Sequence, residues 1–149
     1  MQYDEFYEKP DDALRDRRSR EYRDLFIAPF FPKDKNSRVL DLGCGYGLFL
    51  NACRDSGYQN IFGVDYNVAA VEYATKTIGL KNVRFGDAFA YLEGQLDNSF
   101  DVITAVNFAE HIKKEYIPRL FSLVSKKLKN GGKFIMEVPN ADSIHGVHT

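Results

Sequence analysis

The stretch "VLDLGCGYG", residues 39–47, places three glycines within five positions directly after an apolar run. This pattern is typical of a buried strand that is followed by a tight turn and a helix. Gly43, Gly45 and Gly47 allow positive φ angles in the turn and let a ligand approach the main chain. Asp41 stands two positions before Gly43. The stretch therefore predicts a ligand site in which a carboxylate lies beside a bare backbone loop.

Strands and helices alternate along the chain. Short runs rich in Val, Ile and Phe predict strands at 37–42, 60–65, 82–87, 100–106 and 132–138, and helices are expected at 48–57, 68–79 and 117–132. The alternation predicts an α/β fold, a doubly wound, Rossmann-like, mostly parallel sheet of five strands with helices on both faces. The order that we expect for the strands is 3-2-1-4-5. Ligands bind beyond the C-terminal ends of such strands, which is where the glycines fall.

The residues before the first strand differ in pattern from the rest. We expect residues 1–36 to form an accessory helix or lid, with Leu14, Tyr22, Leu25 and Phe26 as its apolar side. Tyr3, Phe6 and Tyr7 are either part of such a lid or packing residues at the chain terminus. Residues 37–149 are expected to form the core domain, which on this sequence stops shortly after the fifth strand.

Three acidic residues indicate the chemistry of the ligand. Asp41 would repel a pyrophosphate, but it would attract an amino-acid ammonium group or hold loop amides that do so. Asp65 follows the second strand, 22 positions after Gly43, where it can accept hydrogen bonds from two ribose hydroxyls. Asp87 lies a further 22 positions along, where it can accept from an adenine amino group, and Ala88 can present a backbone N–H to the ring. Ammonium, ribose and adenine without phosphate describe S-adenosylmethionine.

Two other interpretations of these residues stay open at this point. A dinucleotide loop has the pattern G-x-G-x-x-G, whereas this chain has G-x-G-x-G, so a nucleotide-dependent oxidoreductase that uses NAD is an alternative function. Asp65 and Asp87 are also residue types that favour turns after strands, and each alone is explained equally well in that way.

At these residues the sequence resembles the class I S-adenosylmethionine-dependent methyltransferases. The resemblance rests on "VLDLGCGYG", Asp65, "GDA" at 86–88, "FDVITAVNFAEHI" at 100–112 and "LKNGGKFIMEVPN" at 128–140, in the family's order. It implies binding of S-adenosylmethionine, with S-adenosylhomocysteine as product. The residues that it assigns to the cofactor are Asp41, Gly43, Gly45, Asp65, Tyr66 beside the adenine, Asp87, Ala88, and Asn107 near the methionine part.

His111 is the candidate catalytic base for methyl transfer to oxygen or nitrogen. It follows the fourth strand, and the ordinary pKa of imidazole, about 6.5, suits proton removal near neutral pH. A structural role, in which this residue caps the next helix, is the equal alternative. Some ubiquinone-type O-methyltransferases bind a metal through E-x-x-E-H at this place, but here Asn107 replaces the first acid. We therefore predict no metal.

Composition indicates the partner class. The net charge of −1 gives no long-range field toward nucleic acid or an anionic membrane, and no apolar stretch resembles a signal peptide or a membrane span. We expect a cytoplasmic protein with a small-molecule or saccharide-type acceptor, and no nucleic-acid or membrane partner. Cys44 and Cys53 are expected to be small apolar fillers.

The fifth strand would lie exposed at the sheet edge if the chain ends after it, and an exposed edge favours pairing with another chain. We therefore expect either a chain that has been shortened from a longer protein or a homodimer that covers this edge. Because the acceptor-binding portion is apparently missing, a cofactor-binding module without activity of its own is a further alternative function.

Overall fold

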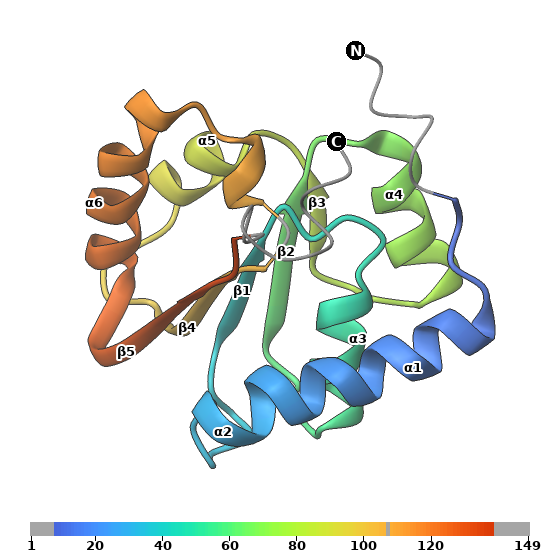
Figure 1. The fold of residues 1–149 in the computed structure, drawn as a ribbon. Coiled ribbons are helices and arrows are strands. Elements are labelled where there is room, and N and C mark those ends of the chain that lie inside the picture. Colours follow the sequence, from blue (N-terminus) through green and yellow to red (C-terminus); the bar gives the residue numbers. More distant parts are fainter. Residues whose placement is uncertain (1–7, 107, 139–149) are drawn as a thin grey trace, which may run out of the picture.

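The computed structural model describes residues 8–106 and 108–138. Its centre is a fully parallel sheet of five strands in the order β3-β2-β1-β4-β5 (Figure 1). The strands are β1 (Val39–Leu42), β2 (Ile61–Asp65), β3 (Val83–Phe85), β4 (Phe100–Ala105) and β5 (Leu128–Met136). The predicted order and direction are confirmed. Because every strand of a parallel sheet ends at the same edge, the glycine loop and the acidic residues that follow β2 and β3 meet there.

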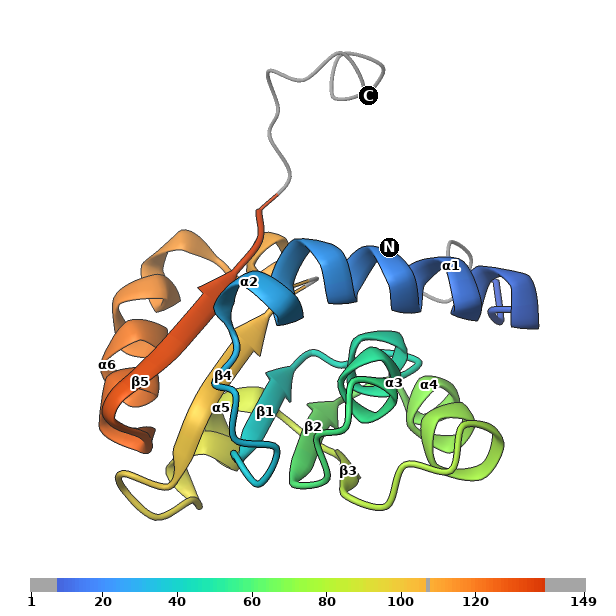
Figure 2. The ribbon, with the colours of Figure 1, turned by 90° about the horizontal axis from the view of Figure 1, so that it is seen from below.

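Helices cover both faces of the sheet, as predicted (Figures 1 and 2). One face carries α1 (Asp12–Tyr22), η2 (Arg23–Ile27), α2 (Ala28–Phe30), α3 (Leu48–Asp55), α4 (Val68–Glu72) and η3 (Tyr73–Thr77). The other carries α5 (Ala88–Glu93) and α6 (Ile117–Lys127), with the short turns η4 (Ala109–His111) and η5 (Lys114–Tyr116) before α6. No helix in the described ranges is long and apolar enough to span a membrane.

The two faces of β1 belong to different apolar clusters. Val39 packs with the α3 side, whereas Leu40 and Leu42 pack with the α5 and α6 side. All four residues of β1 are buried, as expected for a central strand covered on both faces. Residues at odd positions of β1 therefore face α3, and Asp41 is one of them.

The N-terminal helix differs from the prediction in its apolar side. Tyr22 is buried and Phe26 is half-buried, but Leu25 is 62% exposed and Ile27 is buried in its place. The physical reason is the wide π-helical turn of η2, which brings residues five apart onto one side, as with Tyr22 and Ile27. The equivalent turn η3 buries Tyr73 and Ile78, whereas Val68 at the start of α4 is exposed.

Two further boundaries differ from the prediction. The sequence did not predict α5, whose six residues are too few for a clear helical period. The predicted helix 117–132 ends at Lys127, and β5 begins at Leu128 rather than at residue 132. An irregularity in the pairing between Phe100 and Val102 of β4 accommodates this earlier start. Strand β5 is an edge strand of the described sheet, and a homodimer through it stays a prediction.

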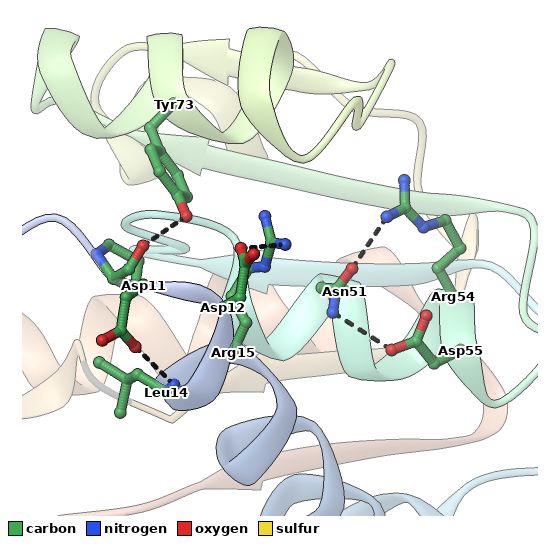
Figure 3. A network of polar contacts seen from close by, with 9 residues as sticks. Asp11, Asp12, Leu14, Arg15, Asn51, Arg54, Asp55 and Tyr73 are labelled. Atoms are coloured by element: carbon green, nitrogen blue, oxygen red, sulfur yellow. Dashed lines mark hydrogen bonds and ion pairs between the residues drawn. The ribbon is translucent and has the colours of Figure 1, made fainter.

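Polar contacts attach the start of α1 to the core (Figure 3). The buried hydroxyl of Tyr73 donates to the carbonyl of Pro10 at 2.7 Å, and the Asp11 side chain caps α1 by accepting from the N–H of Leu14. On α3, Asn51 donates to Asp55, which also accepts from Ser19 of α1. These contacts fix the accessory helix against α3 and η3. A lid function of residues 1–36 stays a prediction.

Replacing Tyr73 by phenylalanine tests this attachment. The change removes one buried hydrogen bond and leaves the carbonyl of Pro10 without its donor, so we expect the free energy of unfolding to fall by about 1–3 kcal/mol in urea titrations. Tyr66→Phe is the control, because the Tyr66 side chain is exposed and its loss of a hydroxyl should leave stability unchanged. Equal stability of the two variants would show that the Pro10 contact contributes nothing.

Candidate functional site

The glycine loop joins β1 to α3, and all three of its glycines adopt positive φ: +65° at Gly43, +53° at Gly45 and +81° at Gly47. Their surroundings differ. A Cβ at Gly43 would lie 2.6 Å from the ring of Phe108, and one at Gly47 would lie 2.6 Å from Leu80. A Cβ at Gly45 would meet nothing within 4 Å. Gly45 is therefore the point of the loop at which a ligand can approach bare backbone.

Asp65, the last residue of β2, holds this loop in place. One carboxylate oxygen accepts from the N–H of Gly45 at 2.9 Å, and the other accepts from the N–H of Asn67 at 2.8 Å. The bond to Asn67 is the local contact of a turn-forming aspartate, but the bond to Gly45 spans 20 residues. Turn formation therefore does not explain Asp65 fully, because its carboxylate also fixes the ligand-facing part of the loop.

Asp41 lies inside the sheet next to the loop and is only 3% exposed. Its carboxylate accepts a hydrogen bond of 2.7 Å from the Thr104 hydroxyl of β4. Burial, together with the charge of Asp65, raises the pKa of Asp41 to about 7, although the Thr104 bond lowers it. An acid with this pKa changes its charge near neutral pH, so Asp41 carries a negative charge beside the loop mainly above about pH 7.

A cleft of about 410 Å³ opens on the α5 side of the loop. Tyr66, Asp87, Ala88 and His111 line it, and Tyr66 is 63% exposed. Asp87 caps α5, because one of its oxygens accepts from the N–H of Ala90 at 2.9 Å. This structural role differs from the turn formation that the sequence allowed for Asp87, because helix α5 was not predicted. The second carboxylate oxygen has further lone pairs with which it can accept from a ligand.

Phe108 connects the loop to this cleft, because its side chain lies against Gly43 and also lines the cleft. Phe108 was not among the predicted site residues, although it directly follows Asn107, which was. The prediction also missed the aromatic wall of Phe89 and Tyr116, whose rings meet edge to face, and Arg119, whose guanidinium lies over Phe89. The signal in the sequence that could have identified Phe108 was its position directly after Asn107, a predicted ligand contact.

The structure thus brings the predicted residues into two adjoining groups. Asp41, Gly43, Gly45 and Asp65 surround the loop, and Tyr66, Asp87, Ala88 and His111 surround the cleft. Asn107 lies outside the described residues. His111 Nε2 is 3.7 Å from Glu110 Oε1, and the described residues contain no group of three or more His, Cys, Asp or Glu side chains that could hold a metal ion.

Comparison with known proteins agrees with this arrangement. Residues 14–148 match the family model described as "Methyltransferase domain". The chain is 36% identical over 106 residues to the ribosomal protein L11 methyltransferase of Clostridium botulinum. The aligned region covers 68% of this chain and 31% of that protein. It is 35% identical over 101 residues to the mitochondrial ubiquinone biosynthesis O-methyltransferase of Schizosaccharomyces pombe. This aligned region covers 63% of this chain and 35% of that protein.

Among solved structures, the fold is similar to a SAM-dependent methyltransferase from Archaeoglobus fulgidus, with a TM-score of 0.77 and 32% identity over 89% of this chain and 57% of that one. The chain spans less than two thirds of the length of each of these three proteins. The family model covers nearly the whole chain. The order of the strands in the structure, and the glycine loop after the first strand, agree with what the sequence predicted. The chain therefore belongs to the class I S-adenosylmethionine-dependent methyltransferase family.

Proposed function

We propose that this chain binds S-adenosylmethionine and transfers its methyl group to an oxygen or nitrogen of an acceptor. The observation that carries the proposal is the arrangement at Gly45, where open backbone is bonded to the carboxylate of Asp65, which is close enough to the buried carboxylate of Asp41 to raise its pKa. A ligand with hydroxyls and an ammonium group fits this arrangement, because both carboxylates attract donors. A pyrophosphate fits less well, because Asp65 and, above about pH 7, Asp41 place negative charge beside the loop.

The residues around the loop would bind the ribose and the amino-acid part. Each oxygen of Asp65 accepts one backbone N–H and keeps a lone pair for a ribose hydroxyl. The negative charge of Asp41 attracts the ligand ammonium from within the sheet, where the low dielectric strengthens the attraction. Gly43 and Gly45 present main chain without side chains. These roles are the ones expected from the sequence.

The cleft would take the adenine. The exposed ring of Tyr66 can flank it, and the free lone pairs of Asp87 can accept from its amino group. Ala88 is in the first turn of α5, where the helix offers no acceptor for its N–H, so that group is available to the ring. The apolar atoms of Phe108 and Phe89 complete a site of the size and chemistry of a small-molecule pocket.

When bound, S-adenosylmethionine supplies a methyl group that its sulfonium makes electrophilic. The chain then has to align an acceptor, exclude water and remove a proton. His111 at the cleft is the proposed base, and no metal is part of the proposal. We propose a small-molecule or saccharide acceptor, in keeping with the net charge of −1. The named relatives act on different acceptors, so the acceptor class rests on this chain's own composition.

Calorimetry with S-adenosylhomocysteine tests the binding function. We expect the wild-type chain to bind S-adenosylhomocysteine and not NAD. Asp65→Asn keeps one acceptor oxygen and the side-chain size but loses the charge, so we expect about tenfold weaker binding. Asp16→Asn, an exposed position on α1 away from the cleft, is the control and should bind as the wild type does.

Two results would contradict the proposal: binding of NAD in preference to S-adenosylhomocysteine, or equal affinity of Asp65→Asn and wild type. A transfer assay with a labelled methyl group over a panel of hydroxyl and amine acceptors then separates an enzyme from a binding module. Binding without transfer to any acceptor would favour the module.

A further inference from the structure

Thr104 and Asp41 form a buried polar pair at the centre of the sheet. They are register partners on the neighbouring strands β4 and β1, so their side chains lie on the same face. Thr104 is fully buried, and its Oγ1 lies 2.7 Å from a carboxylate oxygen of Asp41 and 3.4 Å from the carbonyl oxygen of Leu40. The hydroxyl has a single hydrogen, which the shorter distance assigns to Asp41.

The other groups around Asp41 disfavour its negative charge. Asp65 at the end of β2 repels it, and burial removes its hydration. Cys44 of the glycine loop and Cys53 of α3 also interact with its charge, and burial raises the pKa of both thiols, so they stay neutral. Within the described residues no cation is among the groups that shift the pKa of Asp41, and Thr104 is the group that lowers it. The charge of Asp41 therefore depends on one hydroxyl.

This dependence gives Thr104 a role that packing alone does not require. A valine would fill the same volume in an otherwise apolar layer without a polar atom to satisfy. The hydroxyl can accept from the protonated acid or donate to the ionised carboxylate, and only the second of these bonds favours the charged form and fixes its orientation.

We propose that Thr104 is a positioning residue for cofactor binding, which holds the Asp41 carboxylate ionised and oriented toward the ammonium group of the ligand. The inference rests on the proposed function for the ligand, but the Thr104–Asp41 interaction itself can be measured without any ligand.

The first test is a carbon NMR titration of the Asp41 carboxyl, whose signal is assigned by its absence in Asp41→Asn. We expect Thr104→Val to raise the midpoint by about one to two pH units, the equivalent of one hydrogen bond to a charged group. Thr104→Ser keeps the hydroxyl and should titrate as the wild type does. Thr75→Val is the matched control, since it removes a hydroxyl that bonds to the carbonyl of Val71. An unchanged midpoint in Thr104→Val, or an equal shift in Thr104→Ser, would overturn the inference.

The second test is the affinity for S-adenosylhomocysteine between pH 5.5 and pH 9. At pH 7 we expect Thr104→Val to bind about tenfold more weakly, with the two affinities approaching each other toward pH 9, where Asp41 is ionised in the wild type and at least about half ionised in the variant. A purely structural role would weaken binding equally at every pH and would overturn the inference. If the wild type binds normally and the affinity of Thr104→Val depends on pH in the same way, the role of Thr104 is overturned while the proposed function stands. Failure of wild type to bind at any pH overturns the proposed function.

Discussion

Asp41→Asn is expected to weaken binding of S-adenosylhomocysteine on the order of 100-fold at pH 8, more than any other single change of an acidic side chain around the loop. The substitution keeps the shape of the side chain but removes a charge that lies in a low-dielectric site next to the ligand. Asp65 has a smaller expected effect, because it is more exposed and faces uncharged hydroxyls. Calorimetry at pH 8 measures both, with Asp16→Asn as the exposed control.

The same substitution has a second expected consequence, for folding. The native state keeps a proton on Asp41 up to about pH 7, whereas the unfolded chain loses it near the ordinary pKa of 3.8. Between these values the native state binds more protons, so the contribution of Asp41 to stability falls as pH rises. The full difference is on the order of 4 kcal/mol. The free energy of unfolding of Asp41→Asn, relative to wild type, should therefore increase by up to that amount between pH 4 and pH 8.

Urea titrations of both proteins across this range measure the difference. Asp97, whose pKa is lowered by its contact with Lys127, acts in the opposite direction, but it does so in both proteins and cancels. Parallel pH profiles would contradict the raised pKa of Asp41 in the folded protein. Divergent profiles together with weak binding would show that the fold accepts a cost in stability in order to keep a charge at the ligand site.

The parts of the fold that the sequence predicted are those with a local signal. The run of apolar residues before Gly43 marked the central strand, and alternation of strands and helices was enough to predict a parallel sheet with helices on both faces. The glycines, Asp65 and Asp87 could be placed because they follow strands, and strand ends converge in a parallel sheet.

The remainder depended on contacts that are distant in sequence or on unusual local geometry. Leu25 was misplaced because nothing in the sequence marks the π-helical turn that buries Ile27 instead. The Thr104–Asp41 bond joins residues 63 apart and needs the register of β1 against β4. Phe108 was missed because its contact with Gly43 depends on the path of the chain after β4. Asp41 was identified as a charge near the ligand, but its burial and raised pKa follow only from the packed structure.

The loop glycines are expected to separate stability from binding. Gly47→Ala places a Cβ 2.6 Å from Leu80 and 3.0 Å from the Cβ of Ala74, in a backbone conformation with φ +81°. Both neighbours are buried and cannot withdraw. Left-handed strain of about 1–2 kcal/mol and overpacking of about 1–3 kcal/mol should together lower the free energy of unfolding by about 2–5 kcal/mol.

Gly45→Ala and Gly131→Ala are the matched comparisons. Both positions have positive φ and no atom within 4 Å of the new Cβ. The free energy of unfolding of each variant should therefore fall only by the left-handed strain, about 1–2 kcal/mol. They differ in place, because Gly131 lies on β5 away from the loop. We expect Gly45→Ala to abolish binding of S-adenosylhomocysteine and Gly131→Ala to keep it. If Gly45→Ala binds normally, the open backbone at Gly45 is not where the ligand lies; if Gly47→Ala is as stable as Gly131→Ala, the contacts with Leu80 and Ala74 do not restrict the loop.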